Sequence, residues 1–172
     1  QSHLDAAREL GLLMAADDIE LVYGGGATGL MGLIADTVLQ AGGRVVGVIP
    51  SDLGTEVGHR GLTEFVEVET MHERKSLMYE RSDAFIAMPG GFGTLDEFAE
   101  ISTWRQLGLH DKPIGLLDSD GYYQSLLEFF DRAVTDQLLK EQNRMLVVSG
   151  ATPSSLLELL RTDTASFEPK WQ

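Results

Sequence analysis

Apolar residues recur along this chain in two alternating patterns, one with the period of a helix and one in short continuous runs. The helical period predicts helices at 2–16, 30–40, 71–82, 94–107, 122–134, 136–141 and 153–160, the last capped by Thr152 with Pro153 in its first position. The short apolar runs predict strands at 19–23, 44–49, 64–68, 84–88, 114–117 and 145–148. Helices and strands therefore alternate along the chain.

This alternation predicts an α/β fold, a Rossmann-like doubly wound parallel sheet with helices on both faces. The 172 residues contain no repeat, linker or low-complexity segment, so we expect a single nucleotide-binding domain over 1–172 in which 162–172 is a tail. Folds of this class usually open with a strand, whereas the first predicted element here is a helix. We therefore expect the first strand and its loop to precede Gln1.

Composition and charge narrow the range of partners. A formal net charge of −14 makes a surface that repels nucleic acid and anionic membranes, and no apolar run is long enough to span a membrane. The chain has no cysteine, which excludes disulfides and thiolate chemistry and suits a cytoplasmic location. A small anionic ligand would need a locally basic pocket, so the position of the few basic residues is informative.

The clearest chemical signal lies between the strand predicted at 84–88 and the helix that follows it. Pro89 ends the strand, and three of the next four residues are glycines, namely Gly90, Gly91 and Gly93. A strand, a glycine turn and a helix place bare backbone N–H groups at the positive end of a helix dipole, where phosphate binds. Glycine permits close approach of a ligand and a positive φ. Because Glu97 follows one turn into the helix, the pattern predicts a phosphate site beside a carboxylate.

Thr94 and Glu97 also admit a second interpretation. Their spacing is that of a capping box, in which Glu97 would accept a hydrogen bond from the Thr94 N–H at the start of the helix. The glycine cluster favours ligand binding, since a simple strand–helix turn does not need three glycines. A second turn of this type, at 24–29, contains Gly25 and Gly26 and predicts the same kind of pocket, with tight strand–helix packing as its alternative.

A cluster of basic residues lies on the helix predicted after residue 70. Arg74, Lys75 and Arg81 fall on one face by the three- and four-residue spacing of a helix, together with Met78. Facing a phosphate, these cations would supply the positive potential that so acidic a chain otherwise lacks. The alternative is a solvated helix face whose cations pair with glutamates of the same helix.

These stretches together resemble the Lonely Guy (LOG) family of cytokinin riboside 5′-monophosphate phosphoribohydrolases, members of which have been labelled lysine decarboxylase-like. The motif P-G-G-F-G-T-L-D-E at 89–97 fits the family pattern P-G-G-x-G-T-x-x-E, and M-H-E-R-K at 71–75 fits a second family segment. Further similar segments are Y-G-G-G at 23–26, G-H-R-G-L at 58–62, W-R-Q-L-G at 104–108 and D-K-P at 111–113. The resemblance runs from about Ala6 to Leu160.

The resemblance implies hydrolysis of the N-glycosidic bond of a nucleoside 5′-monophosphate, AMP or an N6-modified AMP, to the base and ribose 5-phosphate. It implies Arg74 and Glu97 as the catalytic pair, and a homodimer as the assembly. The 5′-phosphate would bind at Gly90, Gly91, Gly93 and Thr94, and further substrate contacts are expected at Gly25, Gly26, Met71 and Lys75. We expect no cofactor and no metal, since no His/Cys/Asp cluster has ligand spacing.

Two other functions remain open. A non-catalytic nucleotide sensor or carrier would use the same pocket. The pair of Arg74 and Glu97 argues against this class, because a carboxylate beside a bound anion is costly unless it is used. A lysine decarboxylase dependent on pyridoxal phosphate would need a Schiff-base lysine and a partner for the pyridine nitrogen. Lys75 lies beside Arg74 in a different motif, and the chain is small for such an enzyme.

Overall fold

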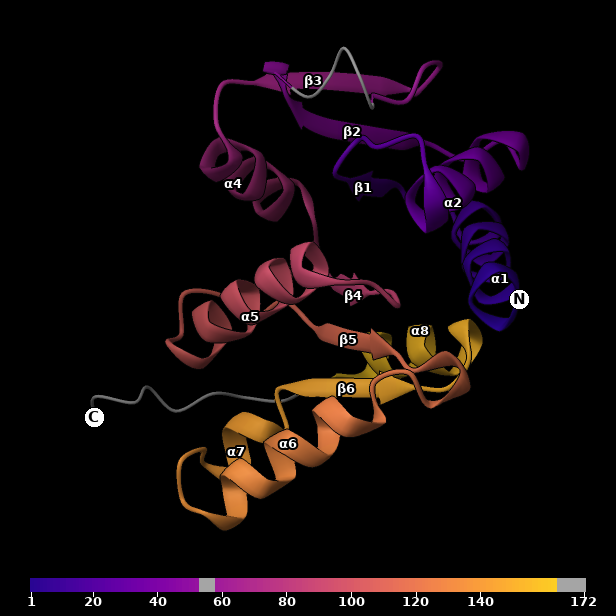
Figure 1. Ribbon diagram of the computed structural model, residues 1–172. Coiled ribbons are helices and arrows are strands. Elements are labelled where there is room, and N and C mark those ends of the chain that lie inside the picture. Colours follow the sequence, from indigo (N-terminus) through magenta and orange to yellow (C-terminus); the bar gives the residue numbers. More distant parts are fainter. Residues whose placement is uncertain (53–57, 164–172) are drawn as a thin grey trace. The chain divides into compact units, whose positions relative to one another are not determined.

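The computed structural model describes residues 1–52 and 58–163 (Figure 1). The chain divides into two compact units, Gln1–Ser82 and Asp83–Gln172, and each is described by itself. Within the described residues, no helix combines the length and the apolar character needed to cross a membrane. The single domain expected over 1–172 stays a prediction.

The first unit is built on a parallel three-stranded sheet. Its strands are β1 (Leu21–Tyr23), β2 (Val45–Pro50) and β3 (Glu64–Val68), with β2 in the middle. The helices of this unit that the structure describes in full are α1 (Ser2–Ala16), α2 (Gly29–Gln40) and α4 (Met71–Arg81). Every residue of β2 is buried, because the strand has a neighbour on each side and contacts both α2 and α4.

Helices α1 and α2 pack side by side in the first unit (Figure 1). Ala7 and Leu10 of α1 and Ala35 and Val38 of α2 are buried, each pair spaced three residues apart on one helix face. A Cβ on Gly11 would lie 3.0 Å from the Cβ of Thr37, so glycine lets the two helices approach closely. This packing anchors the helix that follows the first glycine turn.

The second unit repeats the parallel arrangement. Its strands are β4 (Phe85–Ala87), β5 (Ile114–Leu117) and β6 (Val147–Gly150), with β5 in the middle and fully buried. Its helices are α5 (Phe92–Gln106), the short 3-10 helix η1 (Ser119–Gly121), α6 (Gln124–Thr135), α7 (Glu141–Arg144) and α8 (Pro153–Thr162). Helix α8 packs on β5 and β6, where a Cβ on Gly115 would come within 2.6 Å of Leu156 Cδ1.

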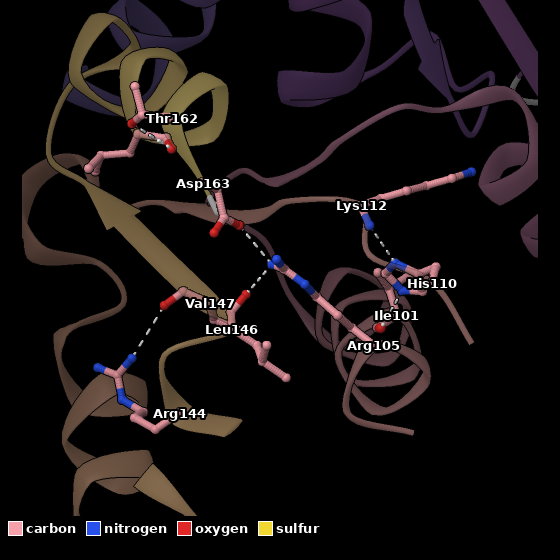
Figure 2. A network of polar contacts seen from close by, with 10 residues as sticks. Ile101, Arg105, His110, Lys112, Arg144, Leu146, Val147, Thr162 and Asp163 are labelled. Atoms are coloured by element: carbon pink, nitrogen blue, oxygen red, sulfur yellow. Dashed lines mark hydrogen bonds and ion pairs between the residues drawn. The ribbon is translucent and has the colours of Figure 1, made fainter. Parts of the chain in front are cut away.

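A buried ion pair ties three elements of the second unit together (Figure 2). Arg105 of α5 is 1% exposed, which requires its charge to be compensated inside the protein. Its Nη1 donates to the Leu146 carbonyl over 2.6 Å and lies 2.9 Å from the Asp163 carboxylate. Helix α5 is thereby joined to the residue before β6 and to the end of α8.

The loop after α5 is fixed by a histidine in the same region (Figure 2). His110 Nε2 lies 3.0 Å from the carbonyl of Ile101, and Nδ1 lies 3.1 Å from the N–H of Lys112. One acceptor and one donor fit a neutral ring, which donates from Nε2 and accepts at Nδ1. Burial is the main cause that lowers the pKa of His110, and this agrees with the neutral form.

The parallel α/β fold flanked by helices is confirmed, as is the cap of α8. Thr152 Oγ1 accepts from the Ser155 N–H, with Pro153 opening the helix. The strand predicted at 84–88 is shorter and only half-buried as β4, because it lies at the edge of its sheet. Helix α8 extends to Thr162, and positions 164–172 of the expected tail lie outside the described residues.

The helix predicted at 136–141 is wrong. Helix α6 ends at Thr135, and the N–H groups of Leu138 and Leu139 turn back to the carbonyl of Ala133. Gln137 has a φ of 61°, a left-handed conformation that does not continue a helix. The next helix therefore begins only at residue 141, and the strand predicted at 145–148 is displaced to β6.

Candidate active site

The turn between β4 and α5 has the predicted order of strand, glycine turn and helix. Helix α5 begins at Phe92, two residues before the predicted start, and Gly91 is its N-cap residue without a side-chain cap. The capping box proposed for Thr94 and Glu97 is therefore wrong, because Thr94 already lies inside the first helical turn. Glu97 lies in the second turn and is half-buried, so the carboxylate belongs to the helix whose N-terminus would face the phosphate.

The physical reason for glycine differs among the three positions of this turn. A Cβ on Gly90 would overlap the Thr94 hydroxyl and lie 3.0 Å from the Thr94 Cβ, so packing requires glycine there. At Gly91 and Gly93 a Cβ would meet no heavy atom of the described chain within 4 Å. The expectation of a positive φ is wrong for all three, since none of them adopts one. Neither packing nor a positive φ demands glycine at 91 and 93, and close approach of a ligand there stays a prediction.

Two neighbouring tyrosines hold the carbonyl groups of this turn. Tyr123 Oη donates to the Met88 carbonyl over 2.5 Å, and Tyr122 Oη donates to the Gly90 carbonyl over 2.7 Å. Tyr123 is buried, and burial raises its pKa to about 12. Sequence reasoning missed both residues, because they lie more than 30 positions further along the chain and carry no motif. Tyr122 thereby fixes the peptide group that carries the Gly91 N–H, whereas the Met88 carbonyl precedes Pro89, which has no N–H, so Tyr123 fixes the start of the turn.

Tyr123→Phe is expected to lower the free energy of unfolding by about 1–3 kcal/mol, because it leaves the carbonyl of the half-buried Met88 without its Tyr123 donor. The KM for the nucleotide should rise as well, since the turn loses one of its two anchors. Urea unfolding and initial-rate kinetics measure the two effects. Tyr122→Phe is the matched control: its side chain is exposed, so we expect the smaller loss of stability. Equal stability of Tyr123→Phe and wild type would contradict the anchoring role.

The glycine turn of the first unit is held more tightly by the protein itself. Gly25 has a φ of 72°, and its Cα would lie 3.0 Å from a Cβ on Gly47 of β2. A Cβ on Gly25 would lie 3.2 Å from the Cβ of Ile49. Packing against β2 and backbone conformation therefore account for glycine at 25, which supports the packing alternative. Substrate contacts at Gly25 and Gly26 stay a prediction.

Arg74 lies directly against this turn. Thr70 caps α4 by accepting the Glu73 N–H at Oγ1, and this fixes the first turn of the helix that carries Arg74. A Cβ on Gly24 would overlap Nη2 of Arg74 and lie 2.8 Å from Cζ, so the guanidinium rests on bare backbone. Nη1 also lies 3.8 Å from the sulfur of Met71, which is exposed. The structure thus brings Arg74 to the turn at Gly24, with Met71 beside its guanidinium, a contact that the sequence analysis missed.

The remaining cations of α4 do not all serve one site. Arg81 pairs with Glu64 of β3 at 2.7 Å, which corrects the expectation that it faces a phosphate together with Arg74. Hydrogen bonding to Arg81 lowers the pKa of the Glu64 carboxyl group. Lys75 is half-buried on the same helix. In the described part of the chain, no group of three or more His, Asp or Glu side chains is arranged to hold a metal ion.

Gly24→Ala is expected to lower kcat/KM by about 10- to 100-fold, because the new methyl group occupies the position of the Arg74 guanidinium. Base release from AMP measures the effect. The control is the double variant Gly24→Ala with Arg74→Ala, compared with Arg74→Ala. If Gly24 acts through Arg74, the double variant loses no more activity than Arg74→Ala. Additive losses would show that the two residues act separately.

The expected site residues are distributed over the two units. Gly25, Gly26, Met71, Arg74 and Lys75 belong to the first unit, and the others, Gly90, Gly91, Gly93, Thr94 and Glu97, belong to the second. Each unit therefore carries a strand, a glycine turn and a helix, with a cation beside one turn and a carboxylate after the other. These features define a Rossmann-like α/β protein.

Comparison with known proteins identifies the family within this fold class. A family model described as "Possible lysine decarboxylase" matches residues 31–160, and the chain belongs to this family, the LOG family. The resemblance inferred from the motifs is confirmed. The chain is 50% identical over 161 residues to "Probable cytokinin riboside 5'-monophosphate phosphoribohydrolase LOGL6" of Oryza sativa subsp. japonica, covering 93% of this chain and 64% of that protein. It is 48% identical over 177 residues to "Cytokinin riboside 5'-monophosphate phosphoribohydrolase LOG1" of Arabidopsis thaliana, covering 99% of this chain and 83% of that protein.

Solved structures share the fold at lower identity. The molybdenum cofactor binding protein from Rippkaea orientalis is 25% identical, with a TM-score of 0.70 over 94% of this chain and 87% of that chain. The molybdenum cofactor carrier protein from Chlamydomonas reinhardtii is 22% identical, with a TM-score of 0.69 over 94% of this chain and 89% of that chain. The second similarity concerns the fold alone.

Proposed function

We propose that this chain hydrolyses the N-glycosidic bond of a nucleoside 5′-monophosphate to the base and ribose 5-phosphate. The substrate is AMP or an N6-modified AMP, such as a cytokinin riboside monophosphate. The observation that carries the proposal is the N-terminus of α5, where Gly91 and Gly93 leave space beside the backbone and Glu97 follows in the next turn. The printed activity of relatives about half identical to this chain supports it.

Phosphate binding provides the first part of the mechanism. N–H groups at the start of α5 and the positive end of its dipole would hold the 5′-phosphate between Gly90 and Thr94. The phosphate is remote from the bond that breaks, so its binding energy can orient the ribose for the chemical step. Tyr122 and Tyr123 support this role by fixing the carbonyls of the same turn.

Cleavage of the N-ribosyl bond passes through a state with positive charge on the ribose. The carboxylate of Glu97 would stabilise this charge and orient or deprotonate the attacking water. The departing base gains electron density, and Arg74 would stabilise it or the phosphate as a fixed cation. An arginine guanidinium does not give up its proton in proteins, so Arg74 acts electrostatically and not as a general acid.

A nucleotide sensor or carrier is the second candidate function. The fold similarity to a molybdenum cofactor binding protein favours it to some extent, because the same scaffold there serves binding. Fold alone does not decide between catalysis and binding. The carboxylate of Glu97 next to an anion site favours the hydrolase.

Incubation of the protein with AMP separates the two functions. Chromatography would follow adenine and ribose 5-phosphate, with Glu97→Gln as the control. Adenine released by wild type and not by the variant supports the hydrolase. If AMP binds but stays intact, and does so also with a longer chain that includes the expected first strand, the result supports the sensor or carrier.

We further propose a homodimer in the cytoplasm, without nucleic acid or membrane as partner. The dimer follows from the family resemblance and the location from the lack of cysteine. The formal net charge of −14 disfavours anionic partners. Sedimentation equilibrium of the purified protein measures the assembly, and a monomer would remove the dimer from the proposal.

A further inference from the structure

We propose that His59 is a positioning residue, whose doubly protonated ring holds the glycine turn at Gly24–Gly26 in its binding conformation. Nucleotide binding then weakens when the ring loses a proton. This inference rests on the proposed function, since it takes the turn as part of the nucleotide site. Sequence reasoning assigned no role to His59.

The backbone around His59 is bonded directly to the glycine turn. The His59 N–H donates to the Gly25 carbonyl over 2.8 Å, and Gly58 and Gly26 form an isolated antiparallel bridge. The segment that begins at Gly58 therefore lies beside the turn like a short extra strand. Whatever fixes this segment also fixes the peptide groups of Gly25 and Gly26.

The side chain of His59 anchors the segment to α2. Nε2 lies 3.1 Å from Oδ1 of Asp36, and Nδ1 lies 2.9 Å from the carbonyl of Arg60. The His59 side chain is only 9% exposed, so water does not readily replace these partners. Asp36 belongs to the helix that begins at Gly29, immediately after the glycine turn. His59 thus ties the turn to the helix that follows it.

Both partners of the ring are hydrogen-bond acceptors. A carboxylate and a backbone carbonyl accept only, so each contact is a hydrogen bond when the facing nitrogen carries a proton. A neutral imidazole has one N–H and an imidazolium has two. The geometry around His59 is completed by the charged ring, in contrast to His110, which faces one acceptor and one donor. Loss of a proton from His59 leaves two acceptors facing each other and loosens the segment.

Few other titratable groups face this histidine in the described residues. From α2 there is Asp36, whose side chain is 56% exposed, so solvent screens its charge in part. Tyr23 of β1 interacts electrostatically with Asp36, and its buried hydroxyl has no hydrogen-bond partner among the described residues. Burial and the charge of Asp36 raise the pKa of Tyr23, so it stays neutral across the range in which histidine titrates. Arg60, next in the chain, keeps its charge throughout.

The first test measures how the KM and the kcat for AMP change with pH, from about pH 5 to about pH 9, in wild type and in two variants. In wild type we expect the KM to rise about five- to tenfold with increasing pH, as one hydrogen bond to a charged group is lost, with little change in kcat. His59→Gln keeps an N–H donor toward Asp36 that does not titrate, so its KM should not follow this rise. His59→Ala should show a high KM at every pH.

A structural role alone would lower the stability of the variants without changing the pH profile. Urea unfolding therefore accompanies the kinetics, and His59→Gln provides the comparison if His59→Ala is poorly folded. A wild-type pH profile that persists in His59→Gln would overturn the proposal.

The second test does not depend on activity. Nitrogen-15 spectra of histidine-labelled protein report the protonation of both ring nitrogens, and His59→Gln assigns its signal among the four histidines. We expect two N–H groups on His59 at the pH values where the KM is low. A neutral ring there would overturn the proposal. If wild type releases no base, the proposed function fails, and calorimetric binding of AMP across the same pH series then decides the role of His59.

Discussion

Glu97→Gln is expected to reduce the release of adenine from AMP by about a thousandfold while the Kd for AMP stays within about threefold of wild type. The substitution keeps the size of the side chain and its ability to accept hydrogen bonds, and removes the negative charge. The charge matters most in the transition state, where the ribose becomes positive. The effect should therefore fall on kcat.

Stopped assays of adenine and ribose 5-phosphate measure kcat, and calorimetry measures the Kd. Asp96→Asn is the matched control, because it removes one negative charge at the neighbouring, exposed position of the same helix. We expect this control to retain the wild-type rate. Turnover by Glu97→Gln at the wild-type rate would remove Glu97 from the mechanism. An equal loss in Asp96→Asn would show that the charge at the helix start, and not Glu97 itself, is responsible.

Arg105→Ala is expected to lower the free energy of unfolding by about 3–5 kcal/mol. The substitution leaves the Asp163 carboxylate, whose side chain is 4% exposed, without its cation in a buried site (Figure 2). It also removes the donor to the Leu146 carbonyl. Since α5 follows the glycine turn at 90–91 and carries Glu97, loss of this anchor should also reduce the proposed activity at temperatures where the variant begins to unfold.

Urea unfolding followed by circular dichroism measures the loss for Arg105→Ala. Arg132→Ala is the control, since Arg132 pairs with Asp136 on the surface of α6 with 73% of its side chain exposed. We expect this exposed pair to contribute no more than about 0.5 kcal/mol. Replacing both buried partners, as Arg105→Met with Asp163→Leu, should restore most of the stability, because no unpaired charge is left. A loss in Arg105→Ala as small as in Arg132→Ala would contradict a buried ion pair.

The sequence by itself determined the kinds of elements and their order. The period of apolar residues decides which face of a helix or strand is buried, and this information is local. It predicted β3 and β5 with their observed bounds, and it located both glycine turns. The motifs at 71–75 and 89–97 also indicated the family, which the match of the family model to residues 31–160 confirms.

Local pattern was insufficient where the end of an element depends on backbone conformation. Gln137 adopts a left-handed conformation just after the end of α6, and its residue type does not predict this conformation. Gly91 caps α5 in the structure, whereas the sequence pointed to Thr94, since both residues are compatible with a helix start.

The tertiary structure alone decided which distant residues contact each other. Arg74 rests on Gly24, Tyr123 holds the Met88 carbonyl, and His59 joins Gly25 to Asp36. None of these contacts follows from a repeat or a spacing, because each depends on packing between elements far apart in the chain. The same holds for the buried charge of Arg105, which a helical pattern alone would place at the surface and which Asp163 compensates 58 positions later. The local sequence determines the helices and strands, and the requirement that buried polar groups are paired determines the polar contacts between them.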